Sequence, residues 1–174
     1  MQHDLQNRIL DILSRTKDMT LATVRPDGAP QATVVSFAND GMTLYFGCGA
    51  GSQKAANIAR EPRVSVTVTP PYSSWDTIEG LSMAATAREV TASGELAAVG
   101  ELMRDRFPQL ADAVPPEAGM MKVFHLRPHF VSVLDYGKGF GHTDLVRVGD
   151  NDITETLESM AHRWIAGVAQ TASD

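Results

Sequence analysis

The feature that most constrains the fold is a pair of turn sequences between short β-prone segments. Residues 20–25 are rich in β-branched side chains and end at Pro26-Asp27-Gly28, and residues 31–38 end at Asn39-Asp40-Gly41. Proline presets the backbone of a turn and glycine accepts a positive φ, so both tripeptides favour tight reversals between strands. A third segment, residues 42–46, alternates apolar and polar side chains. The three segments together predict an antiparallel meander.

Further strand-like segments follow the meander. Valines alternate with serine and threonine in residues 63–69, which predicts a strand with one buried face. We also expect strands within residues 78–91, 121–126 and 130–134, the last two separated by Arg127-Pro128-His129. Short strands joined by hairpins predict a mainly β (α+β) fold, an antiparallel Greek-key barrel or sandwich, rather than a βαβ fold.

Four segments have the apolar spacing of amphipathic helices, each with a polar residue at its expected N-cap. Two of them are inserted between strands and begin at Ser52 and Ser93. The other two are terminal and begin at Asp4 and Asp152, and the second carries an apolar stripe as far as Val168. We therefore expect helices only as insertions and at the ends of the chain.

The charge balance excludes several classes of partner. The 174 residues are enough for one domain, and 15 basic against 21 acidic residues give a net charge of −6. Without a global positive field to attract nucleic acid or anionic lipid, any bound anion must be held by a local basic pocket. A single cysteine, Cys48, and the lack of an apolar run of roughly 20 residues predict a cytoplasmic protein that does not cross a membrane.

A glycine-rich turn, residues 47–51, leads into the helix expected from Ser52. The uncommitted N–H groups and the dipole at a helix start favour an anion, and a phosphate would fit there. Lys54 falls in the first turn of this helix, where a cation is unfavourable unless an anion compensates its charge. The alternative interpretation is an ordinary serine-capped surface helix after a flexible loop.

Four stretches carry a resemblance to a known family: residues 22–31, 44–46, 51–58 and 62–66. Their order and spacing, above all Ser-x-Lys-x-x-Asn-Ile followed by Pro-Arg-Val, resemble the pyridoxamine 5′-phosphate oxidase-like, FMN-binding split β-barrel family. The resemblance extends from about residue 19 to about residue 135 and implies a homodimer with two FMN molecules at the subunit interface.

The resemblance divides the chain into two parts and implies a set of cofactor-binding residues. Residues 1–150 would form the FMN-binding split barrel, and residues 151–174 an amphipathic helix packed on the same domain or on the dimer partner. Main-chain groups of the second strand would face the isoalloxazine ring, Cys48 would lie near the ribityl phosphate, and Ser52 to Lys54 would bind the phosphate. The implied set is Ala32, Thr33, Val34, Val35, Cys48, Ser52, Gln53, Lys54 and Trp75.

Two of these assignments have alternatives that the sequence leaves open. Trp75 would either stack on a ring across the dimer interface or plug the end of the barrel. Asn57, one helical turn after Lys54, would fix the loop rather than contact flavin.

Two departures from the family pattern bear on activity. Vitamin-converting members carry a C-terminal segment rich in arginine and tryptophan that recognises pyridoxine phosphate, and residues 135–144 and the helix expected after them contain no equivalent. Those enzymes also tend to have a flavin-contacting glutamine where this chain has Gly80. The resemblance therefore implies an FMN-dependent oxidoreductase for a small planar substrate other than pyridoxine phosphate, with a deazaflavin as a further cofactor option.

Other functions stay open. Related split barrels bind or degrade haem, for which His125, His129 or His142 would be axial-ligand candidates, and a non-enzymatic flavin-binding module would also lack a substrate clamp. Residues 137–144 form either a mobile loop over the cofactor, with His142 as proton donor and Lys138 as anion contact, or a glycine-rich connector. We expect no metal site, because His125 and His129 would lie roughly 13 Å apart on a strand.

Overall fold

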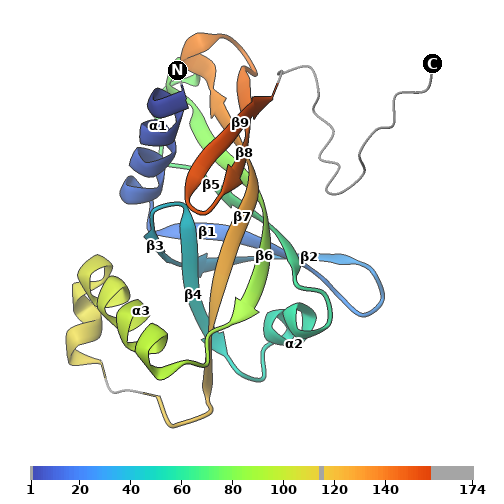
Figure 1. The fold of residues 1–174 in the computed structure, drawn as a ribbon, viewed down its shortest axis with the longest axis vertical. Helices are drawn as coiled ribbons and strands as arrows, with labels where there is room; N and C mark the ends of the chain where they lie inside the picture. Colours follow the sequence, from blue (N-terminus) through green and yellow to red (C-terminus); the bar gives the residue numbers. More distant parts are fainter. Residues whose placement is uncertain (1, 114–115, 158–174) are drawn as a thin grey trace.

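A computed structural model of the chain describes residues 2–113 and 116–157. These residues form a nine-stranded antiparallel sheet that curls into a split barrel, with three α-helices and three 3₁₀ turns around it (Figure 1). The strands are β1 (Asp18–Val24), β2 (Pro30–Ser36), β3 (Ala38–Asp40), β4 (Thr43–Gly49), β5 (Arg63–Val68), β6 (Glu79–Glu89), β7 (Met121–Asp135), β8 (Thr143–Gly149) and β9 (Asp152–Leu157). The helices are α1 (Gln2–Arg15), α2 (Gln53–Arg60) and α3 (Ser93–Arg106), and the 3₁₀ turns are η1 (Trp75–Thr77), η2 (Pro108–Asp112) and η3 (Tyr136–Lys138).

The order of the strands confirms the two predicted hairpins but not the meander. The order is β2-β1-β5-β6-β7-β4-β3, with the β8–β9 hairpin paired to β7. β1 pairs with β2 and β3 pairs with β4, yet β2 and β3 lie at opposite edges of the sheet. The continuous three-stranded meander was therefore wrong at Phe37, which is fully buried between the two strands. Because this side chain enters the core, the chain turns there and closes the barrel, where β2 approaches β4.

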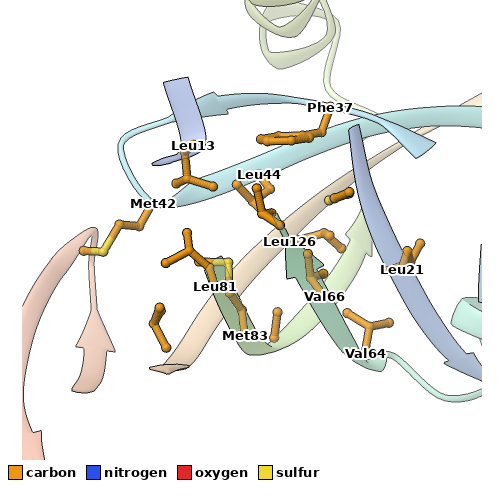
Figure 2. Close-up of a cluster of buried hydrophobic side chains, with 14 of the residues drawn as sticks. Leu13, Leu21, Phe37, Met42, Leu44, Val64, Val66, Leu81, Met83 and Leu126 are labelled. Carbon is orange, nitrogen blue, oxygen red and sulfur yellow. The ribbon is translucent and has the colours of Figure 1, made fainter. Parts of the chain in front are cut away.

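The core is formed by alternating apolar side chains from the strands and by one face of α1 (Figure 2). β5 buries its three valines and exposes the residues between them, as its sequence predicts. Each fully buried side chain of this size contributes about 1.5–3 kcal/mol. The side chains that α1 buries are Leu5, Ile9, Ile12 and Leu13.

The helix boundaries agree with the sequence at one N-cap and differ at two. Ser52 caps α2, and its Oγ accepts a hydrogen bond from the main-chain N–H of Ala55. α1 begins at Gln2, so Asp4 lies inside its first turn, and α3 has Ala92 rather than Ser93 at its N-cap position. None of the helices in the described part of the chain is long and apolar enough to span a membrane.

β7 is a single strand of 15 residues, not the two strands expected on either side of Arg127-Pro128-His129. Its pairing with β6 shifts at a bulge, where Ala84 pairs with Phe130 and Ala85 with Pro128. Its other edge pairs with β4 as far as Leu126 and with β8 from Phe130 onward. The proline, which has no N–H to donate, therefore sits where that edge changes partner, and the strand continues through it.

The C-terminal helix expected from Asp152 is contradicted where the structure describes it. Asp152–Leu157 is β9, which pairs antiparallel with β8. Asp150 and Asn151 have φ values of 50° and 66°, the positive values that a two-residue hairpin turn requires at both central positions. Asp152, the expected helix cap, is instead the first residue of β9, directly after this turn. The rest of the expected stripe, from Met160 to Val168, lies outside the described residues.

Arg106 at the end of α3 ties this helix to α1. Its guanidinium donates to the main-chain carbonyls of Leu13 and Thr16, and to Asn39 Oδ1 at 3.1 Å. It also lies 4.7 Å over the ring of Phe37, and burial lowers its pKa. Carbonyls at a helix C-terminus carry partial negative charge, so a cation there is favourable. α3 is therefore anchored at its C-terminal end.

Candidate functional site

Predicted cofactor residues from β2, β4 and α2 converge on one open groove of about 590 Å³. Val34, Val35, Cys48 and Lys54 line it together with apolar side chains of α3 and β7. Among these lining residues Lys54 alone is charged. Ligand sites are typically apolar with a few placed polar groups, so this groove fits a flat apolar molecule that carries one anionic group.

β2 supplies an unpaired strand edge to the groove. Among the strands described, β2 pairs only with β1, so the main-chain groups along its opposite edge have no ladder partner. Val34 is 71% exposed, and Ala32 is also exposed. Thr33 is half-buried, and its Oγ1 has no hydrogen-bond partner in the part of the chain that the structure covers. The strand thus offers main-chain donors and acceptors beside an apolar surface.

The loop before α2 is held against the end of β4. Ser52 Oγ donates to Cys48 Sγ at 3.4 Å while it accepts from the N–H of Ala55. Lys54 follows in a first turn that contains no acidic residue, and it has no ion-pair partner among residues 2–113 and 116–157. An unpaired cation at the positive end of a helix dipole is unfavourable, and a bound anion would offset both charges.

Gln53 and Asn57 hold α2 on the sheet. Asn57 is fully buried, and its Nδ2 donates to Thr23 Oγ1 at 2.9 Å and to Gln31 Oε1 at 3.0 Å. Gln53 Nε2 donates to Asn57 Oδ1 at 2.8 Å. Asn57 therefore holds α2 against β1 and β2, and its expected role in fixing the loop stays a prediction. The side-chain amide of Gln53 is engaged within the helix, which leaves its main-chain N–H for an anion.

Trp75 lies apart from the groove within one chain. It forms an aromatic cluster with Tyr136 and Phe140, with ring centroids 6.3 Å and 6.0 Å from its own. Trp75 is 67% exposed and Phe140 83% exposed, so the cluster does not plug the barrel. η1 precedes β6, whose first residue pairs with Asp135 at the end of β7 that is remote from the groove.

The three histidines considered as haem ligands also lie outside the groove. His125 and His129 are on β7, and burial lowers the pKa of both. His129 Nε2 lies 2.7 Å from Thr86 Oγ1, and His142 Nε2 lies 3.2 Å from Asp144 Oδ2. Within the described chain, no group of three or more His, Cys, Asp or Glu side chains is placed to bind a metal ion.

The loop from Gly137 to Asp144 is tied to itself by polar contacts. Lys138 Nζ donates to Asp144 Oδ2 at 2.7 Å, beside the contact from His142. Burial alone would raise the pKa of Asp144, but these hydrogen bonds and charges lower it. Lys138 and His142 do not line the groove of their own chain, so their expected roles toward a cofactor stay predictions.

Sequence reasoning missed one wall of the groove. Leu96 and Met103 of α3, Leu110 of η2 and Met121 of β7 line it and remain partly exposed. The available sequence signal was the helical spacing of the apolar residues Leu96, Val99 and Met103. In the structure, only Val99 of this helix is buried. A helix with more apolar stripe than buried surface indicates a face that is available to a ligand or partner.

Gly80, where some relatives are expected to carry glutamine, lies close to the neighbouring strand. A Cβ atom at this position would lie 3.2 Å from the carbonyl oxygen of Val68. A side chain here would need the backbone of β5 to shift by a few tenths of an ångström, so close packing favours glycine at this position independently of any cofactor.

Comparison with known proteins supports the assignment of the fold. Residues 5–135 match the family model described as pyridoxamine 5′-phosphate oxidase. General stress protein 26 of Bacillus subtilis (strain 168) is 34% identical over 65 residues, which cover 37% of this chain and 46% of that protein. The chain therefore matches less than half the length of this curated relative.

Two solved structures share the fold at low sequence identity. A haem-binding protein from Mycobacterium smegmatis superposes with a TM-score of 0.68 at 23% identity, over 80% of this chain and 56% of the other. A pyridoxamine 5′-phosphate oxidase-related, FMN-binding protein from Nostoc punctiforme superposes with a TM-score of 0.63 at 19% identity, over 87% of this chain and 95% of the other. The fold thus occurs both in a protein described as haem-binding and in one described as FMN-binding.

Proposed function

Because the chain belongs to the pyridoxamine 5′-phosphate oxidase family, we propose that it binds FMN in the groove beside β2 and acts as an oxidoreductase on a small planar substrate. One observation carries the proposal: an unpaired first-turn cation, a free strand edge and apolar walls meet in a single groove of about 590 Å³. FMN has the three matching parts, which are a phosphate, a ring edge with donors and acceptors, and a flat ring.

Each part of the groove has a distinct role in this proposal. Lys54, the main-chain N–H of Gln53 and the Ser52-capped start of α2 bind the phosphate. Main-chain groups of residues 32–35 bind the ring edge, and Cys48 lies beside the ribityl chain. When bound, FMN supplies the electron-transfer chemistry, and the protein binds and orients it.

The proposal includes a homodimer in which the second copy covers the groove. Val34, Trp75 and Phe140 are exposed in one chain, Tyr136 is half-buried beside the other two rings, and the apolar wall of α3 is partly exposed. Exposed apolar patches of this kind typically mark interaction sites. In such a dimer Trp75 of the partner subunit would stack on the flavin.

The groove favours FMN over haem and over a phosphorylated substrate. No histidine of the described chain lines it, so it offers no imidazole ligand to a haem iron. Its single cation, Lys54, would already be paired with the phosphate of FMN. Pyridoxine phosphate would therefore find no second cation among the described residues that line the groove, and a substrate without a phosphate fits better.

Replacement of Lys54 tests the proposal. A charge-assisted hydrogen bond is worth about 1.5–3 kcal/mol, so Lys54→Ala should weaken FMN binding by about 10- to 150-fold while the fold is retained. The measurement is a flavin-fluorescence titration, with circular dichroism to check folding. Arg63→Ala is the matched control, because its side chain is 78% exposed and lies outside the groove.

Parallel titrations separate the alternatives. Unchanged FMN affinity in Lys54→Ala, or an equal loss in Arg63→Ala, would contradict the phosphate site. A Soret band with haemin, together with no FMN binding, would identify haem as the ligand. A deazaflavin is tested by the same titration. Turnover with a reduced nicotinamide would distinguish an enzyme from a module that only holds flavin.

A further inference from the structure

A second pocket, of about 440 Å³, shares no lining residue with the cofactor groove. It lies on the face of β6 and β7 that points away from the core, since Phe124 and Leu126 are buried while the residues alternating with them are not. Arg88 of β6 and His125 and Arg127 of β7 line it, and the β8–β9 turn closes one side. We call it the arginine pocket.

Strand register brings the three basic side chains together. Arg88 is the cross-strand partner of His125, and Arg127 lies two residues further along β7, on the same face. Tyr45 is the partner of His125 on the opposite side, and the two rings meet edge to face with centroids 5.3 Å apart. The imidazole therefore sits between an aromatic ring and two guanidinium groups.

The arginine pocket has more hydrogen-bond donors than acceptors. A guanidinium has five N–H donors. Arg88 donates two hydrogen bonds to Glu95, at 3.0 and 2.6 Å, and Arg127 donates one to Asp150, at 2.7 Å. His125 Nδ1 is shielded from solvent and has no hydrogen-bond partner among the described residues. A solute cannot contact so shielded an atom without a side-chain movement, so the donors open to an outside acceptor are the remaining guanidinium N–H groups, which have no partner among the described residues.

The β8–β9 turn adds a further donor. Thr43 Oγ1 donates to Asn151 Oδ1 at 2.8 Å, which fixes this amide and leaves its nitrogen as a donor. Thr43 and Asn151 both line the pocket. The positive φ values of Asp150 and Asn151 place this turn, so the side of the pocket depends on the hairpin that replaced the expected helix.

The charged side chains that line the arginine pocket also favour an anionic ligand. The lining side chains include two arginines and a single carboxylate, Asp150, whose side chain is 94% exposed. Exposed ion pairs are weak and exchange readily with a better-placed anion. Burial and the charge of Arg88 lower the pKa of His125, while the carboxylate of Glu95, the ion-pair partner of Arg88, acts in the opposite direction. The residues that line the pocket carry one more positive than negative charge, in a chain whose net charge is −6.

We propose that the arginine pocket is a binding site for a small phosphate- or carboxylate-bearing metabolite, held by Arg88, Arg127 and His125. The site is separate from the FMN groove and is independent of FMN binding there. Guanidinium groups match the planar, two-oxygen geometry of such anions, and the neighbouring histidine and asparagine add directional donors.

Titration of the whole protein with inorganic phosphate and with succinate tests the proposal, using the NMR signals of the His125 ring as the readout. FMN is added in excess so that the groove is filled, and the titration is repeated on Lys54→Ala. We expect saturable shifts of the His125 signals in both proteins with at least one of the two anions. Because the readout is local to His125, failure of the FMN proposal would leave this result unchanged.

Two variants and one control establish which residues bind. Arg127→Gln and Arg88→Gln should each weaken anion binding by about tenfold or more, while Arg63→Gln, an equally charged change at a surface ion pair, should leave it unchanged. Saturation by phosphate alone or by succinate alone would identify the source of the anionic group. No saturable shift with either anion, or an equal loss in Arg63→Gln, would overturn the proposal.

Discussion

Replacing Asn57 with alanine should destabilise the protein by about 2–4 kcal/mol, because one buried amide joins α2 to two strands. Asn57 is fully buried and makes three side-chain hydrogen bonds, with Gln53, Thr23 and Gln31. Each such bond contributes about 0.5–1.5 kcal/mol net, and a buried group left without its partner adds a desolvation cost of about 1–3 kcal/mol. Thr23, itself 2% exposed, would be left in that state.

Urea denaturation measures this loss, and thermal unfolding should show a decrease in Tm of about 5–15 °C for a chain of this length. Gln53→Ala is the matched control, because it removes one of the three bonds at an exposed side chain and should cost less than about 1 kcal/mol. If Asn57→Ala loses no more stability than Gln53→Ala, the amide network does not hold α2 on the sheet.

Two further changes test single features. Side-chain and main-chain hydrogen bonds from Arg63 lower the pKa of Glu61 from 4.5 to about 2. Because the folded pKa is depressed, the contribution is present above the unfolded value and is lost as pH falls, so the stability difference between wild type and Glu61→Gln should shrink between pH 4.5 and 2 in denaturation curves. Asn151→Val should cost about 1–2 kcal/mol, because a β-branched residue resists a φ of 66°. Asn151→Gly loses the same side chain without backbone strain, so in thermal unfolding it should be the more stable of the two.

Local signals predicted the elements that local chemistry determines. The Pro-Asp-Gly and Asn-Asp-Gly turns, the alternation of β5 and the Ser52 cap each depend on a few neighbouring residues, and all are observed. Two other local signals, the expected caps Asp4 and Ser93, missed the helix starts by one or more residues. The larger failures came where pairing with distant strands determines the structure. β7 continues through Pro128 because its edge changes partner there, and residues 150–152 turn because the following segment pairs with β8. Asp152 suits a helix cap, and Asp150 and Asn151 suit a positive-φ turn, so the sequence alone did not discriminate between a helix and a hairpin at this point.

The candidate site also has a part that could be predicted from the sequence and a part that could not. Residues of β2, β4 and α2 line one groove. Their proximity could be predicted only from the family resemblance, because no local sequence signal relates these three segments in space. The α3 wall and the arginine pocket were missed, since they depend on how far segments fold back on the barrel. His125 and Arg127 are ordinary polar positions of a strand until register places Arg88 beside them.

The way α3 is held connects the stability of the fold to the proposed site. Arg106 fixes the C-terminal end of the helix on carbonyls of the α1 region, whereas of its apolar residues only Val99 is buried. Leu96 and Met103 remain available to the groove. A ligand or partner that fills the groove would bury these side chains, and anything that binds only the folded state stabilises it. The protection of α3 from hydrogen exchange should therefore rise when FMN binds, because Leu96 and Met103 line the groove and are not buried by the rest of the chain.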